Sequence, residues 1–133
     1  MVCTYCGNET QVTNSRLQKR SNAIWRRRKC LKCQNVFSTL ERVDLAQALR
    51  VELTEGKLTP FDRDILFTSI YDSLKHRKHP IQDASELTNT VITTLVKSRQ
   101  AVFSRQEVIE AALKVLERFD NPASVQYAAF HKA

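Results

Sequence analysis

Two short cysteine motifs, Cys3-Thr-Tyr-Cys6 and Cys30-Leu-Lys-Cys33, decide how the first quarter of the chain can fold. Each motif places two thiols in Cys-x-x-Cys spacing. Together they offer the four sulfur ligands that close a tetrahedral Zn²⁺ site. We therefore predict one structural zinc ion, bound by Cys3, Cys6, Cys30 and Cys33, with no position left open for chemistry.

A redox-active Cys-x-x-Cys pair is the alternative interpretation of these motifs. Two pairs occur here and no βαβ pattern surrounds them, so a thioredoxin-like role is disfavoured.

The N-terminus carries no charged stretch followed by an apolar segment, and no run of about 18 apolar residues occurs. We therefore expect a cytoplasmic protein without a membrane span, and in a reducing cytosol paired cysteines favour a metal site over disulfides.

Positive charge is concentrated around the cysteines. The net charge of the chain is +7, and residues 1–50 contain ten basic and three acidic residues. The remaining residues contain 11 of each sign and are neutral. This asymmetry indicates one module that meets a polyanion and a second module with a different task.

The segment Ile24-Trp-Arg-Arg-Arg-Lys-Cys30 leads into the second cysteine pair. In a strand, Arg26 and Arg28 share one face and Arg27 lies on the other. Guanidinium groups on a rigid frame suit phosphate contacts, whereas the alternative is a solvated basic surface. We predict contact with a nucleic acid, and Arg16, Lys19 and Arg20 add to the same electrostatic surface. The predicted nucleic-acid-binding residues are Arg16, Arg26, Arg27, Arg28 and Lys29. Trp25 either stacks on a base or sugar or fills the small core, and we favour the core.

The fold class that these patterns indicate is α+β. Residues 1–43 read as a zinc ribbon with short strands at 9–17, 23–28 and 36–39, stabilised by the metal because the segment is too small for its own core. Residues 44–47 read as a connector. Alternating apolar residues over 48–59, with a turn at Glu55-Gly56, predict a β-hairpin.

Four helices are expected after the hairpin. The first follows residues 59–62 and ends near 76–79, and the second begins at about Asp83. The third opens with the capping-box pattern of Ser104 and Glu107, and Pro122 suits the first turn of the fourth. The predicted core positions are Phe67, Ile70, Tyr71, Leu74, Leu87, Val91, Leu95, Val108, Ala112, Val115, Phe119, Val125, Ala128 and Ala129.

No catalytic pattern accompanies these elements. The three histidines, His76, His79 and His131, are more consistent with helix-end and terminal positions than with metal ligands. No Ser/His/Asp order, paired carboxylates or phosphate-binding loop occurs. We therefore expect that the protein is not an enzyme.

The ribbon resembles that of the NrdR family, bacterial transcriptional repressors of ribonucleotide reductase genes. Asn14-Ser15-Arg16, the segment from Ile24 to Cys30, and Phe37-Ser-Thr-Leu-Glu-Arg42 are similar to the family's Asp-Ser-Arg, Ile-Arg-Arg-Arg-Arg-x-Cys and Phe-Thr-Thr-Tyr-Glu-Arg. The resemblance implies a zinc-ribbon DNA-binding domain at 1–43. It also implies a nucleotide-binding ATP-cone at 48–133 that regulates and assembles the protein, with Phe61-Asp62-Arg63 as a matching signature.

The second half departs from the family at the positions that hold triphosphate. The family motif Val-x-Lys-Arg-Asp-Gly is here Val51-Glu-Leu-Thr-Glu-Gly56, so Leu53 and Thr54 replace two cations, and Ile65 replaces a lysine. Each charge-assisted hydrogen bond lost in this way is worth about 1.5–3 kcal/mol. Lys57 and Arg63 are cations that remain nearby. We expect that the cone fold is retained and that the response to ATP or dATP is weakened or lost. The residues that remain as nucleotide-site candidates are Val51, Gly56, Lys57, Phe61 and Arg63.

The function implied by residues and resemblance together is DNA-binding repression of ribonucleotide reductase genes. The helical module is expected to form a homo-oligomer, so that two ribbons reach two half-sites. Two other functions remain open. The ribbon can instead dock on another protein without binding specific DNA, or the chain can be a regulatory fragment of a reductase-like enzyme, although it contains no catalytic domain.

Overall fold

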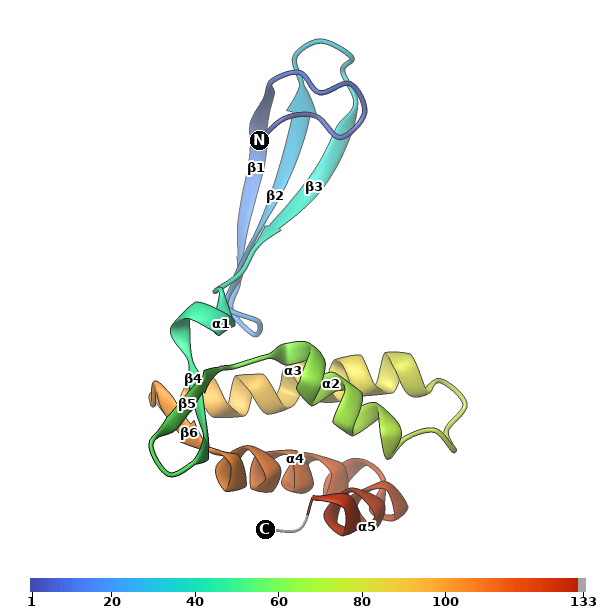
Figure 1. The fold of residues 1–133 in the computed structure, drawn as a ribbon. Coiled ribbons are helices and arrows are strands. Elements are labelled where there is room, and N and C mark those ends of the chain that lie inside the picture. Colours follow the sequence, from blue (N-terminus) through green and yellow to red (C-terminus); the bar gives the residue numbers. More distant parts are fainter. Residues whose placement is uncertain (132–133) are drawn as a thin grey trace. The chain divides into compact units, whose positions relative to one another are not determined.

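The chain folds into two units in the computed structural model, which describes residues 1–131 (Figure 1). The first unit comprises Met1–Val43 and the second begins at Asp44. The predicted second domain, 48–133, therefore begins four residues after the structural boundary. Its last two residues lie outside the described part of the chain.

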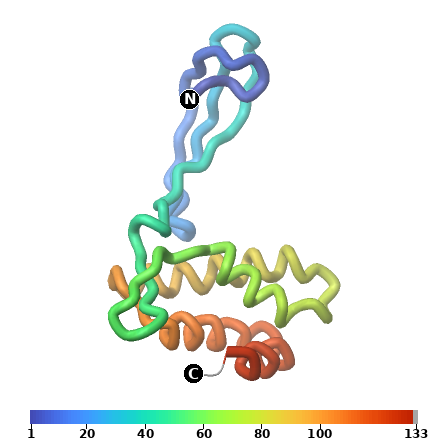
Figure 2. Tube along the Cα trace, viewed as in Figure 1, coloured from blue at the N-terminus to red at the C-terminus, as the bar shows by residue number. Residues whose placement is uncertain are grey.

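The first unit is a three-stranded antiparallel sheet with its loops at the cysteines. The strands are β1 (Thr10–Gln18), β2 (Ala23–Cys30) and β3 (Val36–Glu41), and β2 lies in the centre. The two cysteine loops lie at the same end of this sheet (Figure 2). All three predicted strands are present; β1 is shifted by one residue, and β2 and β3 each extend two residues beyond the predicted end. Residue 13 forms a bulge in β1, between the pairs Val12–Arg28 and Asn14–Arg27.

The second unit combines a small sheet with a helical layer. Its first helix, α1 (Leu45–Ala48), lies in the segment predicted as a connector. The predicted hairpin is present as β4 (Arg50–Thr54) and β5 (Lys57–Pro60), with Gly56 at a φ of 76° in the turn. A third strand, β6 (Val102–Ser104), pairs in parallel with β4. The sequence analysis missed this strand because three residues are too few to show an alternating pattern.

The four predicted helices are all present. They are α2 (Arg63–Asp72), α3 (Pro80–Lys97), α4 (Arg105–Phe119) and α5 (Asn121–Phe130). The capping box at Ser104 is formed as predicted. Helix α2 ends earlier than predicted, so His76 and His79 belong to the loop before α3 or to its N-cap. Among the described residues, no helix is both long and apolar enough to cross a membrane.

The core of the second unit lies between the helices and the small sheet. It is formed by Leu49, Phe61, Leu66, Ile70, Leu74, Ala84, Leu87, Val91, Leu95, Phe103, Ile109, Ala112, Leu116, Ala123 and Tyr127. The predicted face of α3 is confirmed by Leu87, Val91 and Leu95. On α2, Ile70 is buried, and so is Leu74 just after the helix; Phe67 and Tyr71 pack beside them.

The predicted core face of α4 is confirmed at Ala112 and wrong at Phe119, and the buried row is offset by one residue at its other positions. Ile109, Ala112 and Leu116 are buried, whereas Phe119 is 40% exposed. Val108 and Val115 are half-buried beside the core. Two apolar rows, offset by one position, both fit a helical period in α4, and the sequence pattern alone does not choose between them.

Helix α5 turns a different face inward from the one predicted. Ala123, Ser124 and Tyr127 are buried, and Val125, Ala128 and Ala129 are exposed. The rotation is set at the N-cap, where the Asp120 carboxylate accepts from the Ala123 backbone N–H at 3.0 Å. The same carboxylate accepts from Arg77 Nη1 at 2.9 Å and lies 3.0 Å from His76 Nε2. These contacts fix the start of α5 against the loop before α3.

Candidate zinc and DNA-binding site

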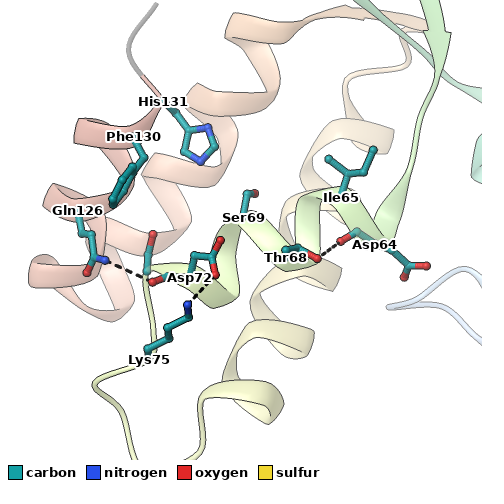
Figure 3. Close-up of a pocket in the computed structure, with 10 residues that line it drawn as sticks. Asp64, Ile65, Thr68, Ser69, Asp72, Lys75, Gln126, Phe130 and His131 are labelled. Carbon is teal, nitrogen blue, oxygen red and sulfur yellow. Dashed lines mark hydrogen bonds and ion pairs between the residues drawn. The ribbon is translucent and has the colours of Figure 1, made fainter.

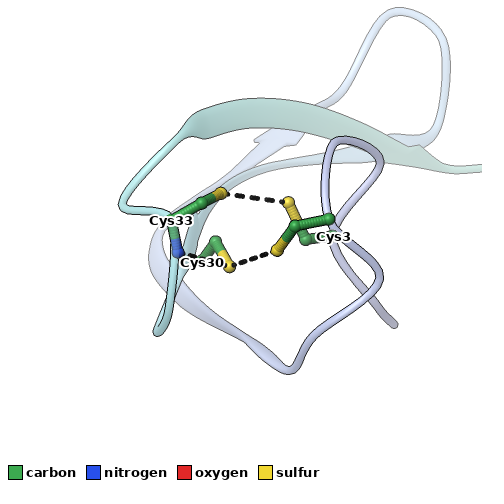
Figure 4. A group of neighbouring side chains, drawn as sticks. Cys3, Cys30 and Cys33 are labelled. Carbon is green, nitrogen blue, oxygen red and sulfur yellow. Dashed lines mark hydrogen bonds between the residues drawn. The ribbon is translucent and has the colours of Figure 1, made fainter.

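The four cysteine sulfurs form a single cluster at one end of the ribbon. All four Sγ atoms lie within 4.8 Å of one another. Cys3 Sγ lies 3.7 Å from Cys33 Sγ, and Cys6 Sγ lies 3.5 Å from Cys30 Sγ (Figure 4). A disulfide would need about 2.05 Å. Four sulfurs placed about 2.3 Å from a central Zn²⁺ on a tetrahedron are about 3.8 Å apart. The donor set and its spacing therefore fit one zinc ion.

The two cysteine loops are structural copies of one another. Each reads Cys-x-x-Cys, then a residue in the left-handed region, then asparagine. Gly7 occupies that left-handed position at a φ of 76° and Gln34 at 64°. The asparagine side chains then donate to the second sulfur of each pair, from Asn8 to Cys6 at 3.3 Å and from Asn35 to Cys33 at 3.4 Å. The sequence analysis missed both asparagines, although the repeated Cys-x-Asn spacing was visible in the sequence.

Backbone amides complete the shell around the first sulfur of each pair. Cys3 Sγ accepts from the Tyr5 N–H at 3.3 Å. Cys30 Sγ accepts from the N–H groups of Lys32 and Cys33, both at 3.4 Å. Such donors stabilise a thiolate and orient it as a metal ligand. Each loop is therefore built to present two oriented thiolates to one point.

Hydrogen bonds and neighbouring sulfurs shift the pKa values of Cys6 and Cys33 in opposite directions. Donation from the Asn8 side chain is the main cause that lowers the pKa of Cys6 to about 6. At Cys33, donation from the Asn35 backbone lowers the pKa, but burial and the neighbouring sulfurs outweigh it and raise the pKa to about 11. Four negative charges this close repel one another, so the fully deprotonated cluster needs a bound cation.

Strand β2 distributes the predicted DNA-binding residues over both faces of the sheet. Directly opposed residues on neighbouring strands share a face. Trp25 opposes Arg16 and Leu40, and Arg27 opposes Asn14 and Ser38. Lys29 lies on this same face because it is two residues beyond Arg27. We call this the open face and define it by Arg16, Trp25, Arg27 and Lys29.

The remaining two predicted residues, Arg26 and Arg28, lie on the opposite face, as the alternation in the sequence predicted. Arg26 Nη1 forms an ion pair with Glu41 Oε2 at 3.0 Å. Arg28 Nη1 donates to Thr10 Oγ1 at 3.4 Å, and its Nε is buried without a partner in the described part of the chain. Phe37, opposite Arg28, meets the Tyr5 ring edge-on at 6.4 Å between centroids. The first cysteine loop therefore covers part of this face.

Trp25 does not fill a core as expected. The buried residues of the ribbon are Cys3, Ala23 and Cys30, and Trp25 is only half-buried. A single sheet has no second layer behind it that would enclose a ring of this size. The guanidinium carbon of Arg16 lies 5.9 Å from the centre of the Trp25 ring, within the range of a cation–π contact.

The candidate nucleotide residues do not gather into a phosphate site. Phe61 is 3% exposed and belongs to the core, and Val51 packs against that core. Arg63 donates to Asn89 Oδ1 at 2.9 Å and to Ser85 Oγ at 3.2 Å, so its guanidinium is bound to α3. Lys57 is exposed at the start of β5, and Gly56 lies in the turn before it.

The chain's own carboxylates occupy two places where an anion would otherwise bind. The Gly56 N–H in the hairpin turn donates to Glu52 Oε1 at 2.9 Å. At the N-terminus of α4, Glu107 Oε2 accepts from the Ser104 N–H at 2.7 Å. A shallow hollow between these elements has one cation and two glutamates in its lining, which comprises Glu52, Leu53, Thr54, Glu55, Ser104, Arg105, Gln106 and Ile109.

A second hollow lies between α2 and α5 (Figure 3). Lys75 Nζ, at its edge, pairs with Asp72 at 3.2 Å, and Gln126 donates to the Asp72 backbone oxygen at 3.4 Å. Ile65 and Phe130 also line it, and they are 70% and 73% exposed. The paired lysine and the two aspartates in its lining make this hollow electrostatically unfavourable for a phosphate.

Comparison with known proteins places the chain in a family. The domain family described as "Transcriptional repressor NrdR-like, N-terminal domain" matches residues 1–41. The protein called transcriptional repressor NrdR in Afipia carboxidovorans is 35% identical over 133 residues, which cover 99% of this chain and 84% of that protein. The NrdR repressor of Phenylobacterium zucineum is 34% identical, with 99% and 85% covered, and that of Gluconobacter oxydans is 35% identical, with 99% and 80% covered. The cluster that fits a zinc ion and this similarity along the whole chain agree: the protein belongs to the NrdR family of transcriptional repressors and is not an enzyme.

Proposed function

We propose that the protein represses transcription, with ribonucleotide reductase genes as its target, by binding duplex DNA through its zinc ribbon. The observation that carries this proposal is the uncompensated positive charge of the ribbon. Arg16 and Arg27 are exposed, and neither forms an ion pair among the described residues. Phosphate contacts of this kind supply most of the affinity of a small DNA-binding module.

Zinc has a structural role in this proposal. Cys3, Cys6, Cys30 and Cys33 are the ligands, and all four coordination positions are filled by sulfur. The metal fixes the two cysteine loops to one end of the sheet, so that β2 presents its cations on a rigid frame. The protein acts in the bacterial cytoplasm, at the nucleoid when it is bound to DNA.

The second unit joins copies of the protein into a homo-oligomer. Ile65 on α2 and Phe130 on α5 line the same hollow, and their apolar side chains are 70% and 73% exposed. An exposed apolar patch is typical of an interface. Two ribbons in one assembly contact two half-sites, which gives a small module the specificity that a single ribbon lacks.

The response to ATP or dATP is lost or strongly weakened in this chain. Glu52 and Glu107 already satisfy the turn and helix N–H groups next to the hairpin. Arg63 is bound to α3, and the two positions that carry cations in the family's motif are Leu53 and Thr54. Titration calorimetry of the full-length protein with ATP and dATP tests this proposal, and micromolar binding of either nucleotide contradicts it.

A mobility-shift experiment at increasing salt tests DNA binding itself. A promoter fragment of a ribonucleotide reductase gene serves as the probe and a fragment of equal length from within a gene as the control. A DNA repressor binds the promoter more tightly, and its affinity falls steeply as salt increases. If the ribbon instead docks on a protein, both fragments bind equally weakly or not at all.

A further inference from the structure

We propose that the open face of the ribbon is the DNA-contacting face, and that Arg26 and Arg28 on the opposite face stabilise the ribbon instead of binding phosphate. This inference rests on the proposed function, because it assigns the DNA contact to particular residues. The alternation along the strand already predicts that Arg27 lies opposite Arg26 and Arg28. The structure adds that the two groups of cations have different surroundings.

Charge compensation distinguishes the two faces. On the opposite face, Arg26 is paired with Glu41 at 3.0 Å, and its side chain is only 30% exposed. A phosphate approaching Arg26 must displace that carboxylate and then lie beside it, which costs Coulomb energy. On the open face, no acidic residue occurs among the strand residues of the sheet. The charges of Arg16, Arg27 and Lys29 are therefore available to a polyanion.

Access distinguishes the faces as well. The Nε atom of Arg28 is buried, its Nη1 donates to Thr10 Oγ1, and the loop that carries Tyr5 packs on its neighbour Phe37. Along β3, Phe37 and Thr39 on this opposite face are half-buried, whereas Ser38 and Leu40 on the open face are exposed. Along β3, the open face is therefore the more accessible of the two.

The polar groups of the open face suit the backbone of a nucleic acid. Asn14 and Ser38 lie on either side of Arg27 and are exposed, and both side chains can donate to phosphate oxygens. Trp25 lies between Arg16 and Leu40, with its ring half-buried. A ring held in this way stacks on a sugar or base without ordering a flexible side chain.

Two pairs of variants test the assignment in the full-length, zinc-loaded protein. Binding to a mixed-sequence duplex of about 30 base pairs is measured by fluorescence anisotropy over a series of salt concentrations. Arg27→Gln and Lys29→Gln should each weaken binding at low salt and reduce the slope of log K against log salt by about 0.9. Arg26→Gln is the matched comparison on the same strand. It should lower the thermal stability of the ribbon, but the zinc-loaded variant should keep the wild-type slope of log K against log salt. Arg28→Gln should behave in the same way.

Trp25 supplies a second readout because it is the only tryptophan in the chain. Its emission should change on addition of the duplex, both in the wild type and in Arg26→Gln, since the ring lies on the contacting face. If the Trp25 emission of the wild type is unchanged at saturating DNA, the inference is overturned. This readout does not depend on whether any variant folds.

The outcomes separate this inference from the proposed function. If the slope of log K against log salt falls in Arg26→Gln and Arg28→Gln but stays at the wild-type value in Arg27→Gln and Lys29→Gln, then the opposite face contacts DNA. The inference is then overturned and the proposed function stands. If wild-type binding is absent or independent of salt, on this duplex and on the reductase promoter alike, both are overturned.

Discussion

The Asn8 side chain donates to Cys6 Sγ at 3.3 Å, and Asn35 donates to Cys33 Sγ in the same way at 3.4 Å. Each asparagine follows its cysteine by two residues, after a residue in the left-handed region. The two halves of the cluster thus use one local design twice. Because these donors hold the sulfurs in place, we expect them to affect zinc affinity without touching the metal.

Replacing either asparagine should therefore weaken zinc binding. We expect Asn8→Ala and Asn35→Ala each to raise the dissociation constant for Zn²⁺ by about 10- to 100-fold, the usual effect of losing a group that orients a ligand. Competition with a chromophoric chelator measures this constant. Asn14→Ala, in the same ribbon but outside the cysteine loops, is the control, and equal affinities in all three variants would contradict the role of the donors.

Removal of zinc should unfold the first unit alone. The buried residues of the ribbon are Cys3, Ala23 and Cys30, of which two are thiols of the cluster, so little apolar burial remains without the metal. The second unit has a separate core and contains the four long helices. Hydrogen exchange should show loss of protection over 1–43 after chelation, with the helical far-UV signal retained. Loss of that helical signal on chelation would show that the second unit depends on the metal.

The elements that the sequence predicted well are those with strong local signals. The cysteine spacing predicted the ribbon, the alternation in β2 predicted the faces of Arg26, Arg27 and Arg28, and Ser104 with Glu107 predicted the start of α4. Each of these signals depends on residues close together in the chain. Local chemistry is enough to determine them.

The features that the sequence did not predict depend on tertiary contacts. Strand β6 exists because it pairs with β4, about fifty residues earlier in the chain. The inward face of α5 is set by Asp120 and its contacts with Arg77 and His76. The binding of Arg63 to α3 likewise removes a cation that looked available in the sequence. None of these contacts leaves a periodic pattern.

Substitution of Asp120 should destabilise the second unit. Burial alone would raise the pKa of Asp120, but the Ala123 N–H, Arg77 and His76 outweigh it and hold the pKa at about 2. We expect Asp120→Ala to lower the free energy of unfolding by about 2 kcal/mol, because it removes a helix cap and a paired carboxylate. Asp72→Ala is the control, since Asp72 is 54% exposed and its ion pair within residues 1–131 is with Lys75 on the surface, a pair worth about 0–1 kcal/mol.

The pH dependence of this contribution has a definite sign. The pKa of Asp120 in the folded state lies below its ordinary value of 3.8, so the carboxylate stabilises the fold fully above that value. The contribution is lost as pH falls from about 3.8 toward 2. Denaturant unfolding, followed by the helical signal, should therefore show a steeper loss of stability over this range in the wild type than in Asp120→Ala. Parallel pH profiles would show that Asp120 is not the titrating group.

The exposed apolar residues of α2 and α5 should determine the oligomeric state. We expect Ile65→Asp and Phe130→Asp to lower the mass measured by light scattering after size-exclusion chromatography, because each places a charge in a buried interface. Ile81→Asp is the control, since Ile81 is 64% exposed on α3 and does not line the hollow between α2 and α5. An unchanged mass in the first two variants, or an equal loss in all three, would show that copies associate elsewhere.

Restoring cations at the hairpin should restore nucleotide binding. Leu53 is 47% exposed and Thr54 is exposed at the end of β4, so both positions accept long side chains without disturbing the core. A charge-assisted hydrogen bond contributes about 1.5–3 kcal/mol. Leu53→Lys combined with Thr54→Arg should therefore raise the affinity for ATP by at least about tenfold in titration calorimetry. Addition of Glu52→Gln should raise it further, because the Gly56 N–H then no longer faces a carboxylate.

The control for this gain carries the same added charge in another place. Thr90→Lys with Thr94→Arg adds two cations to an exposed surface of α3, where an increase in net charge alone attracts ATP only weakly. If only the hairpin variant gains affinity for ATP, then the missing cations, and not the fold, limit nucleotide binding. If the wild type already binds ATP at micromolar concentration, or if both double variants gain equally, then Glu52 and the lost cations do not explain the behaviour of the site.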